Sequence, residues 1–441
     1  MRGSADFFVA GRRLSAPLIL ATVLAANIGA GATVGAAGLG YRDGLSAWWW
    51  NGSAAIGSVF LALFIGPRIW KVAKEHNLYT AGDYLELRYG PAVRAIVTSL
   101  IWLGTLSILA GQLIAGAAVL AVVADVPRST GIALSAVVMT VYFVAGGLLS
   151  SAWVNAVQLV VLLGGFAIAL PLVIANAGGL SQVLAPAGTP PTYDSMAYSQ
   201  GPGSGWMLMF ALVPAFIISP GLMQKAYGAR SERSVRMGIG VQAVVLALFA
   251  FIPVLFGMAA RATSPELTDP NMVLPTVLAE QLPVWLGALA LAAVFSAEVS
   301  TCDALLFMLA TSLSQDMYKR FLRPQATDQQ LLRVARIAAI AGAIGGVLFA
   351  LWLPTVTDAL RIFYSLLGVS VLVPVVGGLY TRAGSAAALA SIGAGVATLL
   401  VVRFTLASTF PWLDATLAGL VAAAIAFGLT ALASSRQQPN R

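Results

Sequence analysis

Long apolar stretches separated by short polar ones make up most of this chain. A helix needs about 20 predominantly apolar residues to cross the hydrocarbon core of a bilayer. Twelve segments meet this requirement, near 16–41, 45–67, 95–124, 129–151, 153–177, 205–224, 237–260, 284–314, 336–355, 359–380, 384–405 and 413–434. The pattern therefore predicts an all-α integral membrane protein with about 12 transmembrane helices.

Composition supports the same class of protein. Apolar residues are 59% of the 441-residue chain and charged residues only 10%, whereas soluble domains carry roughly 25% charged residues. A water-facing surface cannot be built from so few charges, so most of the surface must face lipid. No long polar block interrupts the pattern, and we expect residues 1–441 to form a single membrane transport domain.

The basic residues predict the orientation of the chain. If the N-terminus is cytoplasmic, 20 of the 25 Lys and Arg residues fall in cytoplasmic segments, as the positive-inside rule requires. We therefore expect a multi-pass protein of the cell (plasma) membrane with both termini cytoplasmic. The basic residues of these cytoplasmic segments account for the net charge of +8. No basic run is dense enough for a nucleic-acid-binding arm. The predicted partners are the lipid bilayer and a small-molecule solute, without nucleic acid, around a monomeric transport unit.

Catalytic constellations are missing from the sequence. The only cysteine is Cys302, and the only histidine, His76, stands in a polar loop between Glu75 and Asn77. A Ser–His–Asp triad would need that histidine in a protected site, and a single cysteine excludes a disulfide framework or a Cys-rich metal site. We therefore predict a transporter rather than an enzyme.

One apolar segment carries ionisable residues where they are costly. Of the 17 acids, only Glu298 and Asp303 lie well inside a predicted span, and charged residues at that depth are usually functional. They flank Ser300 and Thr301, whose hydroxyls share a helix face with Ala297 because the offsets are three and four residues. Such a face can offer oxygen ligands to a small hard cation such as sodium. Alternatively, the hydroxyls bond back to carbonyls of their own helix.

Two predicted spans are interrupted by helix-weakening residues. Gly29 and Gly31 stand in the middle of the first span, and Pro220-Gly221 in the sixth. A break at membrane depth is tolerated where it lines a cavity, and it frees carbonyls for a cation and N–H groups for an anion. The alternative for the first span is a face of small residues that packs against another helix. Interruptions five spans apart are typical of an inverted repeat of five plus five helices.

Four motifs, in this order along the chain, resemble the sodium/solute symporters, a family that includes sodium/galactose, sodium/proline and sialic acid transporters. They are Asp6–Arg13, before the first core helix, Tyr79–Gly90 after the second, Gly146-Gly147 with Trp153 and Gln158 at the fifth, and Ser300-Thr301 with Asp316–Lys319 at the eighth. The resemblance implies the leucine-transporter-type fold. Its first five-helix repeat would be 16–177 and its second 205–380, followed by two extra helices in 384–434.

The resemblance also implies a sodium site between the first and eighth core helices. Its ligands would be the backbone carbonyls of Ala25, Ile28 and Ala297 and the hydroxyls of Ser300 and Thr301. The implied ion is therefore bound on the Ser/Thr face that spacing alone had already singled out.

A second ion site departs from the pattern of the family. Many members place an aspartate on the fifth helix, where this chain has Asn155. Asp303, three residues after Ser300, adds an acid on the eighth helix instead. We expect Asp303 to serve a possible second cation or to act as an electrostatic aid to the first; the alternative is a structural role.

The solute is expected to be a small carboxylate or amino acid rather than a sugar. Positions that carry sugar ligands in the galactose transporter match Ala32, Asn51, Ala54 and Ser219, and only two of these can bond a hydroxyl. Each unpaired polar group would cost about 1–3 kcal/mol. The predicted substrate-binding residues are Asn27, Gly29, Ala32, Asn51 and Ser219.

These observations predict sodium-coupled symport of a small organic solute by alternating access, with the sodium ion as the only expected cofactor. Two alternatives stay open at this point. Glu298 could make the protein a proton-coupled solute transporter, or the fold could serve as a transporter-like solute sensor.

Overall fold

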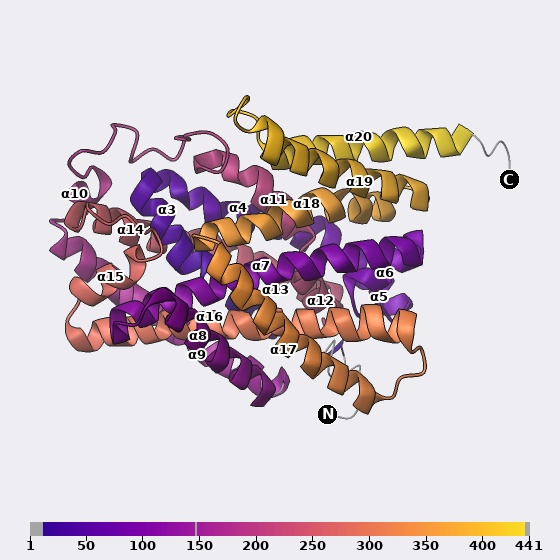
Figure 1. The fold of residues 1–441 in the computed structure, drawn as a ribbon, viewed down its shortest axis with the longest axis horizontal. Helices are drawn as coiled ribbons and strands as arrows, with labels where there is room; N and C mark the ends of the chain where they lie inside the picture. Colours follow the sequence, from indigo (N-terminus) through magenta and orange to yellow (C-terminus); the bar gives the residue numbers. More distant parts are fainter. Residues whose placement is uncertain (1–11, 146–147, 437–441) are drawn as a thin grey trace.

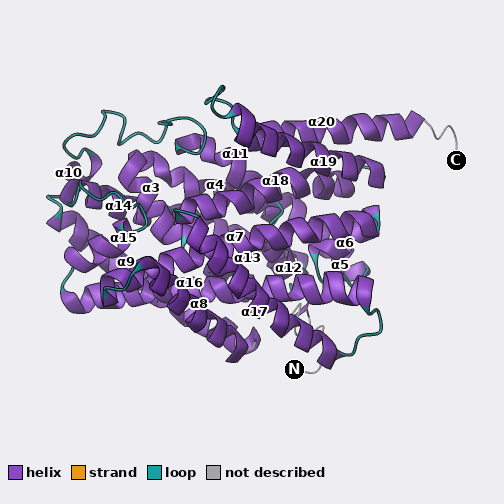
Figure 2. Cartoon of the chain, viewed as in Figure 1, coloured by secondary structure: helices purple, strands orange, loops and turns teal. Residues whose placement is uncertain are grey.

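The computed structural model describes residues 12–145 and 148–436, with only the backbone described for 144–145, 148–153, 155–156 and 435–436. Within these ranges the chain is almost entirely helical, as Figure 2 shows, and strand-like pairing is confined to one bridge between Leu14 and Ala229. The predicted all-α class is therefore confirmed. Most of the long helices run along the longest axis of the molecule (Figure 1).

The first predicted span is broken in its middle. Helix α2 (Ala16–Asn27) ends before Ile28, and helix resumes as a π-helical turn, η2 (Gly31–Gly35), that continues into α3 (Ala36–Asp43). Residues Ile28 to Ala30 between them are not helical. The break lies where Gly29 weakens the helix, as the sequence predicted.

A glycine turn follows α3. Gly44 has a φ of 67°, and a β-carbon there would collide with the Tyr193 carbonyl, so only glycine fits this turn. The elements that follow are η3 (Gly44–Trp48), α4 (Trp49–Phe60), η4 (Leu61–Ile65) and α5 (Gly66–Glu75).

Local sequence explains the start of helix α6 (Ala81–Tyr89). Thr80 accepts a hydrogen bond from the Asp83 amide while the Asp83 carboxylate accepts one from the Thr80 amide, which is a capping box. Gly90, with a φ of 90°, ends the helix, and Pro91 begins the next one. Helices α7 (Pro91–Ala124), α8 (Arg128–Ala145), α9 (Leu148–Asn176) and α10 (Leu180–Leu184) follow.

The sixth predicted span is also broken. After the short η5 (Gly205–Leu208), helix α11 (Met209–Ile217) ends before Ile218, and α12 (Pro220–Tyr227) begins at Pro220. Proline suits the first position of a helix because it has no N–H to leave unsatisfied. Gly221 therefore lies just inside α12, and the break itself is at Ile218 and Ser219.

The remaining elements complete the bundle. They are α13 (Glu232–Phe249), α14 (Phe251–Thr263), α15 (Val273–Glu280), α16 (Val284–Thr311), η6 (Ser312–Leu322), α17 (Asp328–Trp352), α18 (Val356–Tyr380), α19 (Ser385–Val401), η7 (Val402–Leu406) and α20 (Ala415–Arg436). Figure 1 places α19 and α20 side by side at one edge of the molecule.

Ten helices of the described chain are long and apolar enough to cross a membrane. Each of the twelve predicted segments contains helix, but the helices divide differently. Gly31–Glu75 counts as one helix of 45 residues by these criteria, and Ala16–Asn27 and Arg128–Phe143 are shorter apolar helices. The number of twelve spans therefore stays a prediction.

Polarity is distributed as expected for a protein surrounded by lipid. Large apolar side chains face outward, and Val160 and Leu429 are 71% and 64% exposed. Polar side chains such as Thr105, Ser107 and Gln112 are buried instead. Apolar side chains gain no hydrophobic free energy by moving from lipid into the bundle. Packing inside the bundle therefore depends on close van der Waals contact and internal hydrogen bonds.

Candidate functional site

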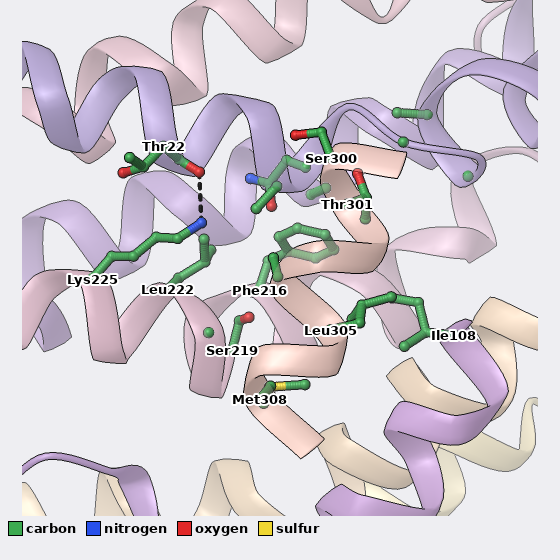
Figure 3. A pocket seen from close by; sticks show the side chains of 18 of the residues that line it. Thr22, Ile108, Phe216, Ser219, Leu222, Lys225, Ser300, Thr301, Leu305 and Met308 are labelled. Atoms are coloured by element: carbon green, nitrogen blue, oxygen red, sulfur yellow. Dashed lines mark hydrogen bonds between the residues drawn. The ribbon is translucent and has the colours of Figure 1, made fainter. Parts of the chain in front are cut away.

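A cavity of about 600 Å³ lies inside the bundle between the two broken helices and α16. Side chains from α2, α12 and α16 surround it in Figure 3. At one end it is lined by the exposed residues Arg13 and Leu18, and deeper in by the buried Trp50. The volume is within the range of about 300–1,000 Å³ typical of small-molecule sites.

The break in the first span forms a narrow cradle against α16. Gly29 packs so closely that a β-carbon there would collide with Thr301 Oγ1 and lie 2.7 Å from Gln112 Oε1. Ile28, just past the end of α2, has a ψ of 81°, far from the helical value of about −42°. Its carbonyl therefore leaves the direction of the helix.

Three of the predicted sodium ligands meet at this cradle. Thr301 Oγ1 is 3.4 Å from the Ala25 carbonyl oxygen, contributed by α2, and 3.1 Å from the Ala297 carbonyl oxygen of its own helix. Thr301 thus bonds back to its helix, as the alternative reading anticipated, and still reaches across to the broken helix. Its hydroxyl oxygen keeps lone pairs for an ion while it donates.

Ser300 behaves differently from Thr301. It is only 3% exposed, and its hydroxyl has no hydrogen-bond partner among the described residues. A buried hydroxyl is normally paired, because leaving it unpaired costs free energy. An unpaired hydroxyl oxygen on the residue next to Thr301 is available to a small cation, which prefers oxygen ligands. No group of three or more His, Cys, Asp or Glu residues suited to a metal occurs in the described ranges.

All five predicted substrate-binding residues line the cavity: Asn27, Gly29, Ala32, Asn51 and Ser219. Two of them are in contact, since Asn51 Nδ2 donates to the Ala32 carbonyl at 3.1 Å. Nδ2 of Asn27 is buried and has no partner in the described part of the chain. The fold therefore brings all five residues to one cavity, and their role in solute binding stays a prediction.

Two of the polar lining residues that were not singled out from the sequence contact the first broken helix. Gln112 on α7 is 1% exposed, and its Oε1 accepts a hydrogen bond of 2.9 Å from the Ala30 amide in the first break. A glutamine in the middle of a long apolar segment was a signal that could have found it. Its side chain braces the non-helical backbone of the cradle.

Lys225 is the second such residue. The sequence placed it among the basic residues of a cytoplasmic loop, but it lies in the last turn of α12 and lines the cavity. Its Nζ donates to the Thr22 carbonyl on α2 at 2.6 Å (Figure 3). None of the ion pairs found between described residues includes Lys225; they are Arg42–Asp43, Lys71–Glu232, Arg94–Asp83, Arg94–Glu86, Arg94–Asp316, Arg236–Glu232 and Arg320–Glu86.

The two intramembrane acids lie in different surroundings. Asp303 lines the cavity on the same helix as Ser300 and Thr301. Glu298 is 0% exposed and is not among the lining residues. The fifth-helix motif cannot be compared, because Gly146 and Gly147 lie outside the described residues and the side chains of Trp153 and Asn155 are not described. The motif at Asp6 also begins outside them.

A charged layer surrounds the end of α3. Asp43 is fully buried, pairs with Arg42 at 2.6 Å and accepts a hydrogen bond of 3.0 Å from Ser204 Oγ. Arg361 on α18 donates to the Gly203 carbonyl of the same loop. None of these residues lines the cavity.

A second ionic cluster holds the α6 end together. Arg94 on α7 bonds to Asp316 at 2.5 Å, to Asp83 at 2.8 Å and to Glu86 at 2.7 Å, and Arg320 also pairs with Glu86. Burial opposes ionisation of Glu86, but hydrogen bonds from Arg94 and Arg320 outweigh it and hold the pKa of that carboxyl below its ordinary value. The cluster joins α6, α7 and η6.

A helical membrane bundle with two broken helices facing one central cavity defines a class of protein, the secondary transporters with discontinuous helices. The profile of the sodium:solute symporter family matches residues 7–400, and the chain belongs to this family.

Individual relatives agree with this assignment. The chain is 28% identical to the sodium/pantothenate symporter of Escherichia coli (strain K12) over 79% of this chain and 73% of the relative. It is 25% identical to the sodium/glucose cotransporter of Vibrio parahaemolyticus over 98% of this chain and 86% of the relative. These relatives are transporters and not enzymes, and the protein is a multi-pass membrane transporter.

Among solved structures, the fold matches a Na⁺-coupled sialic acid symporter in a substrate-bound outward-open state. The TM-score is 0.81 at 19% identity, covering 98% of this chain and 92% of that chain. The likeness places the fold among transporters of the leucine-transporter type.

Proposed function

We propose that the protein is a sodium-driven symporter that moves a small organic carboxylate or amino acid across the cell membrane by alternating access. The observation that carries the proposal is the cradle at the first break, where the Thr301 hydroxyl reaches the Ala25 carbonyl and the buried hydroxyl of the next residue in sequence, Ser300, has no partner among the described residues. A sodium ion bound there by Ala25, Ile28, Ala297, Ser300 and Thr301 would tie α2 to α16. Ion binding would thereby favour one arrangement of the broken helix.

The lining of the cavity supports an anionic solute group over a sugar. The ionisable side chains of the lining that can carry charge near neutral pH are two basic and one acidic, Arg13, Lys225 and Asp303, and the basic pair offers donors for a solute carboxylate. A relative in Escherichia coli is named as a symporter of pantothenate, a carboxylate, which is compatible with this choice.

The architecture we propose follows the two breaks. Residues 16–177 and 205–380 form two five-helix repeats, each with a broken first helix, and 384–434 adds two helices. The α6 end, with Lys71, Arg88 and Arg320, faces the cytoplasm together with both termini. The cavity, lined by the exposed Arg13, then opens toward the cytoplasm while the Arg42–Asp43 layer closes the outside. We take the transport unit to be a monomer.

Transport into proteoliposomes tests the proposal. Radiolabelled pantothenate, proline and glucose are offered to the purified protein with an inward sodium gradient, with equal sodium on both sides, or with potassium in its place. We expect accumulation of a carboxylate or amino acid only with the sodium gradient. Equal uptake in sodium and potassium would contradict sodium coupling, and uptake of glucose alone would contradict the proposed solute class.

Asp303 is proposed to aid the ion site through its charge. At a separation of about 6 Å and an effective dielectric of about 20, a unit-charge attraction is worth roughly 3 kcal/mol before desolvation. Asp303→Asn should therefore weaken sodium binding while the protein still folds. Normal sodium dependence of the folded variant would assign Asp303 a structural role.

A further inference from the structure

A second pocket lies on the outside of the bundle, apart from the central cavity. Its lining comes from η4, the start of α5, the start of α13 and the last residue of α18, and none of these residues lines the central cavity. Most of the lining side chains are exposed. The volume is about 190 Å³, several times the share of about 30 Å³ that a water molecule occupies in the liquid. A group of several heavy atoms therefore has room there.

Basic side chains dominate the polar part of this pocket. Arg68, Lys71 and Arg236 line it together with a single acid, Glu232. Glu232 pairs with two of the bases, since its carboxylate oxygens are 3.2 Å from Lys71 Nζ and 2.8 Å from Arg236 Nη2. Three positive charges against one negative charge leave an excess of two, so the pocket attracts an anion.

Arg68 is the base that has no acidic partner. Its guanidinium carbon lies 4.0 Å from the centre of the Tyr380 ring, and none of the ion pairs between described residues includes it. A guanidinium that stacks on an aromatic ring still has the N–H groups in its own plane to donate. Those groups match the oxygens of a phosphate in a bidentate manner. Arg68 is therefore available to bind a phosphate group.

Exposed apolar side chains precede Arg68 and follow Arg236 along the chain. They are Phe60, Leu63 and Phe64 on α4 and η4, and Met237, Val241 and Val244 on α13. Spacings of three and four residues put the second group on one face of α13. Two rows of lipid-facing apolar side chains therefore end at the charged pocket.

The two apolar rows lie on elements that are in contact. A β-carbon on Gly66 would lie 2.9 Å from Val235 Cγ1, and one on Gly240 would lie 3.9 Å from Ala62 Cβ. The η4 segment and the start of α5 thus pack directly against α13. The rows consequently border one patch of the lipid-facing surface, with the basic pocket at its end.

A basic pocket at the end of an apolar patch matches an amphiphile with an anionic head group, as basic pockets between transmembrane helices do for anionic lipids. We propose that this pocket binds an anionic phospholipid. Its phosphate accepts hydrogen bonds from Arg68, Lys71 and Arg236, and its acyl chains lie along the two apolar rows. The ammonium of a zwitterionic lipid would find only Glu232, which already pairs with two bases. In the orientation proposed above, the lipid belongs to the cytoplasmic leaflet.

Native mass spectrometry of the purified protein in detergent tests the preference for an anionic lipid. The probes are phosphatidylglycerol, phosphatidylcholine and inorganic phosphate. We expect the wild type to bind phosphatidylglycerol at least fivefold more tightly than phosphatidylcholine, and equal affinities would overturn the proposal. Inorganic phosphate at the same concentration should not displace the lipid, because it lacks acyl chains. Displacement would show that the pocket takes a free phosphate and would overturn the assignment to a lipid.

Substitutions locate the site. Arg68→Gln/Arg236→Gln should lower the affinity for phosphatidylglycerol at least fivefold. The matched control Lys74→Gln/Arg233→Gln removes the same number of positive charges from α5 and α13, at exposed residues outside the pocket, and should stay within twofold of the wild type. An equal loss in both proteins would mean that the lipid responds to the basic surface as a whole, and the pocket would be excluded.

The single substitution Arg68→Gln carries the test if the double variant does not fold. Arg68 is exposed and belongs to no ion pair of the described chain, so this variant should fold. Its affinity for phosphatidylglycerol should decrease at least twofold, whereas Lys74→Gln should bind as the wild type does. Unchanged affinity of Arg68→Gln would overturn the proposal. Lipid binding is measured without transport, so the outcome is independent of the proposed sodium coupling.

Discussion

At the scale of single residues, the oxygen cradle depends on two neighbouring side chains in different states. Thr301 spans from Ala297 to Ala25, whereas Ser300 is buried without a partner in the described chain. Both hydroxyls would contribute to sodium affinity. The Thr301 hydroxyl also bonds to its own helix, whereas the Ser300 hydroxyl makes no hydrogen bond within the described chain, so its removal should not break one.

The first prediction concerns these hydroxyls. Ser300→Ala and Thr301→Ala should each raise the sodium concentration for half-maximal uptake by about tenfold, since a lost ligand worth about 1.4 kcal/mol changes affinity tenfold. The control is Thr311→Ala on the same helix, whose hydroxyl bonds to the Phe307 carbonyl and does not line the cavity. Unchanged sodium dependence in both site variants would exclude the cradle as the ion site.

Lys225 gives the second prediction. Lys225→Met should weaken the apparent affinity for a transported carboxylate by about 10- to 100-fold, because hydrogen bonds to charged groups contribute roughly 1.5–3 kcal/mol. Half-saturation by sodium should stay the same. Competition by pantothenate and by its uncharged alcohol panthenol measures the preference for the anion.

The matched control for Lys225 is Lys74→Met, at an exposed lysine of α5 that does not line the cavity. If the Lys225 variant keeps the full preference for the anion, then Lys225 serves only to tie α12 to the Thr22 carbonyl.

At the scale of elements, the two breaks divide helices that would otherwise cross the membrane unbroken. Glycine and proline chemistry predicted both breaks, and helical spacing predicted the Ser/Thr face. The sequence did not reveal which glycine touches α16, because that depends on packing between helices far apart in the chain. For the same reason Lys225 was assigned to a loop, and the ionic cluster around Arg94 was not foreseen.

Gly29 and Gly221 were both predicted to mark helix breaks because glycine weakens a helix, but their surroundings in the structure differ. This difference gives the third prediction. Gly29→Ala should abolish sodium-dependent uptake, because its β-carbon would collide with Thr301 Oγ1 and crowd Gln112. Gly221→Ala should transport normally, since no atom lies within 4 Å of the added carbon. The measurement is sodium-dependent uptake by the two variants at matched protein levels. Equal effects of the two substitutions would mean that helix flexibility matters more than close packing.

The ionic cluster that joins α6, α7 and η6 gives the fourth prediction. The pKa of Glu86 in the folded protein is below its ordinary value of 4.5, so its contribution to stability is fully present above that value and is lost as the pH falls through the folded pKa. The thermal midpoint in detergent should therefore be steady near neutrality and decrease at acidic pH.

Glu86→Gln should lower the midpoint at pH 7 and make its decline in acid shallower. Glu75→Gln, at an exposed acid that ends α5, serves as the control. A Glu86 variant with the same acid dependence as the wild type would show that the cluster does not respond as an ion pair.

At the scale of the whole molecule, the cavity reaches an exposed residue, Arg13, while the layer of Arg42, Asp43 and Ser204 at the end of α3 does not line it. In the proposed orientation this chain is in the state that releases its cargo to the cytoplasm.

One consequence of Lys225 in that cavity concerns the energy available for accumulation. A carrier that moves one sodium ion with one monovalent anion transfers no net charge. The membrane potential, worth about 2.3 kcal/mol per charge per 100 mV, would then do no work, and a tenfold sodium gradient alone supports about tenfold accumulation at about 1.4 kcal/mol. Uptake at neutral pH on both sides should accordingly be insensitive to a valinomycin-imposed potassium diffusion potential. If a second monovalent cation without a concentration gradient of its own enters in the same cycle, the cycle becomes electrogenic, and an inside-negative voltage should raise accumulation toward several hundred-fold, since about 3.7 kcal/mol would then be available. Voltage dependence therefore reports how many positive charges accompany each carboxylate.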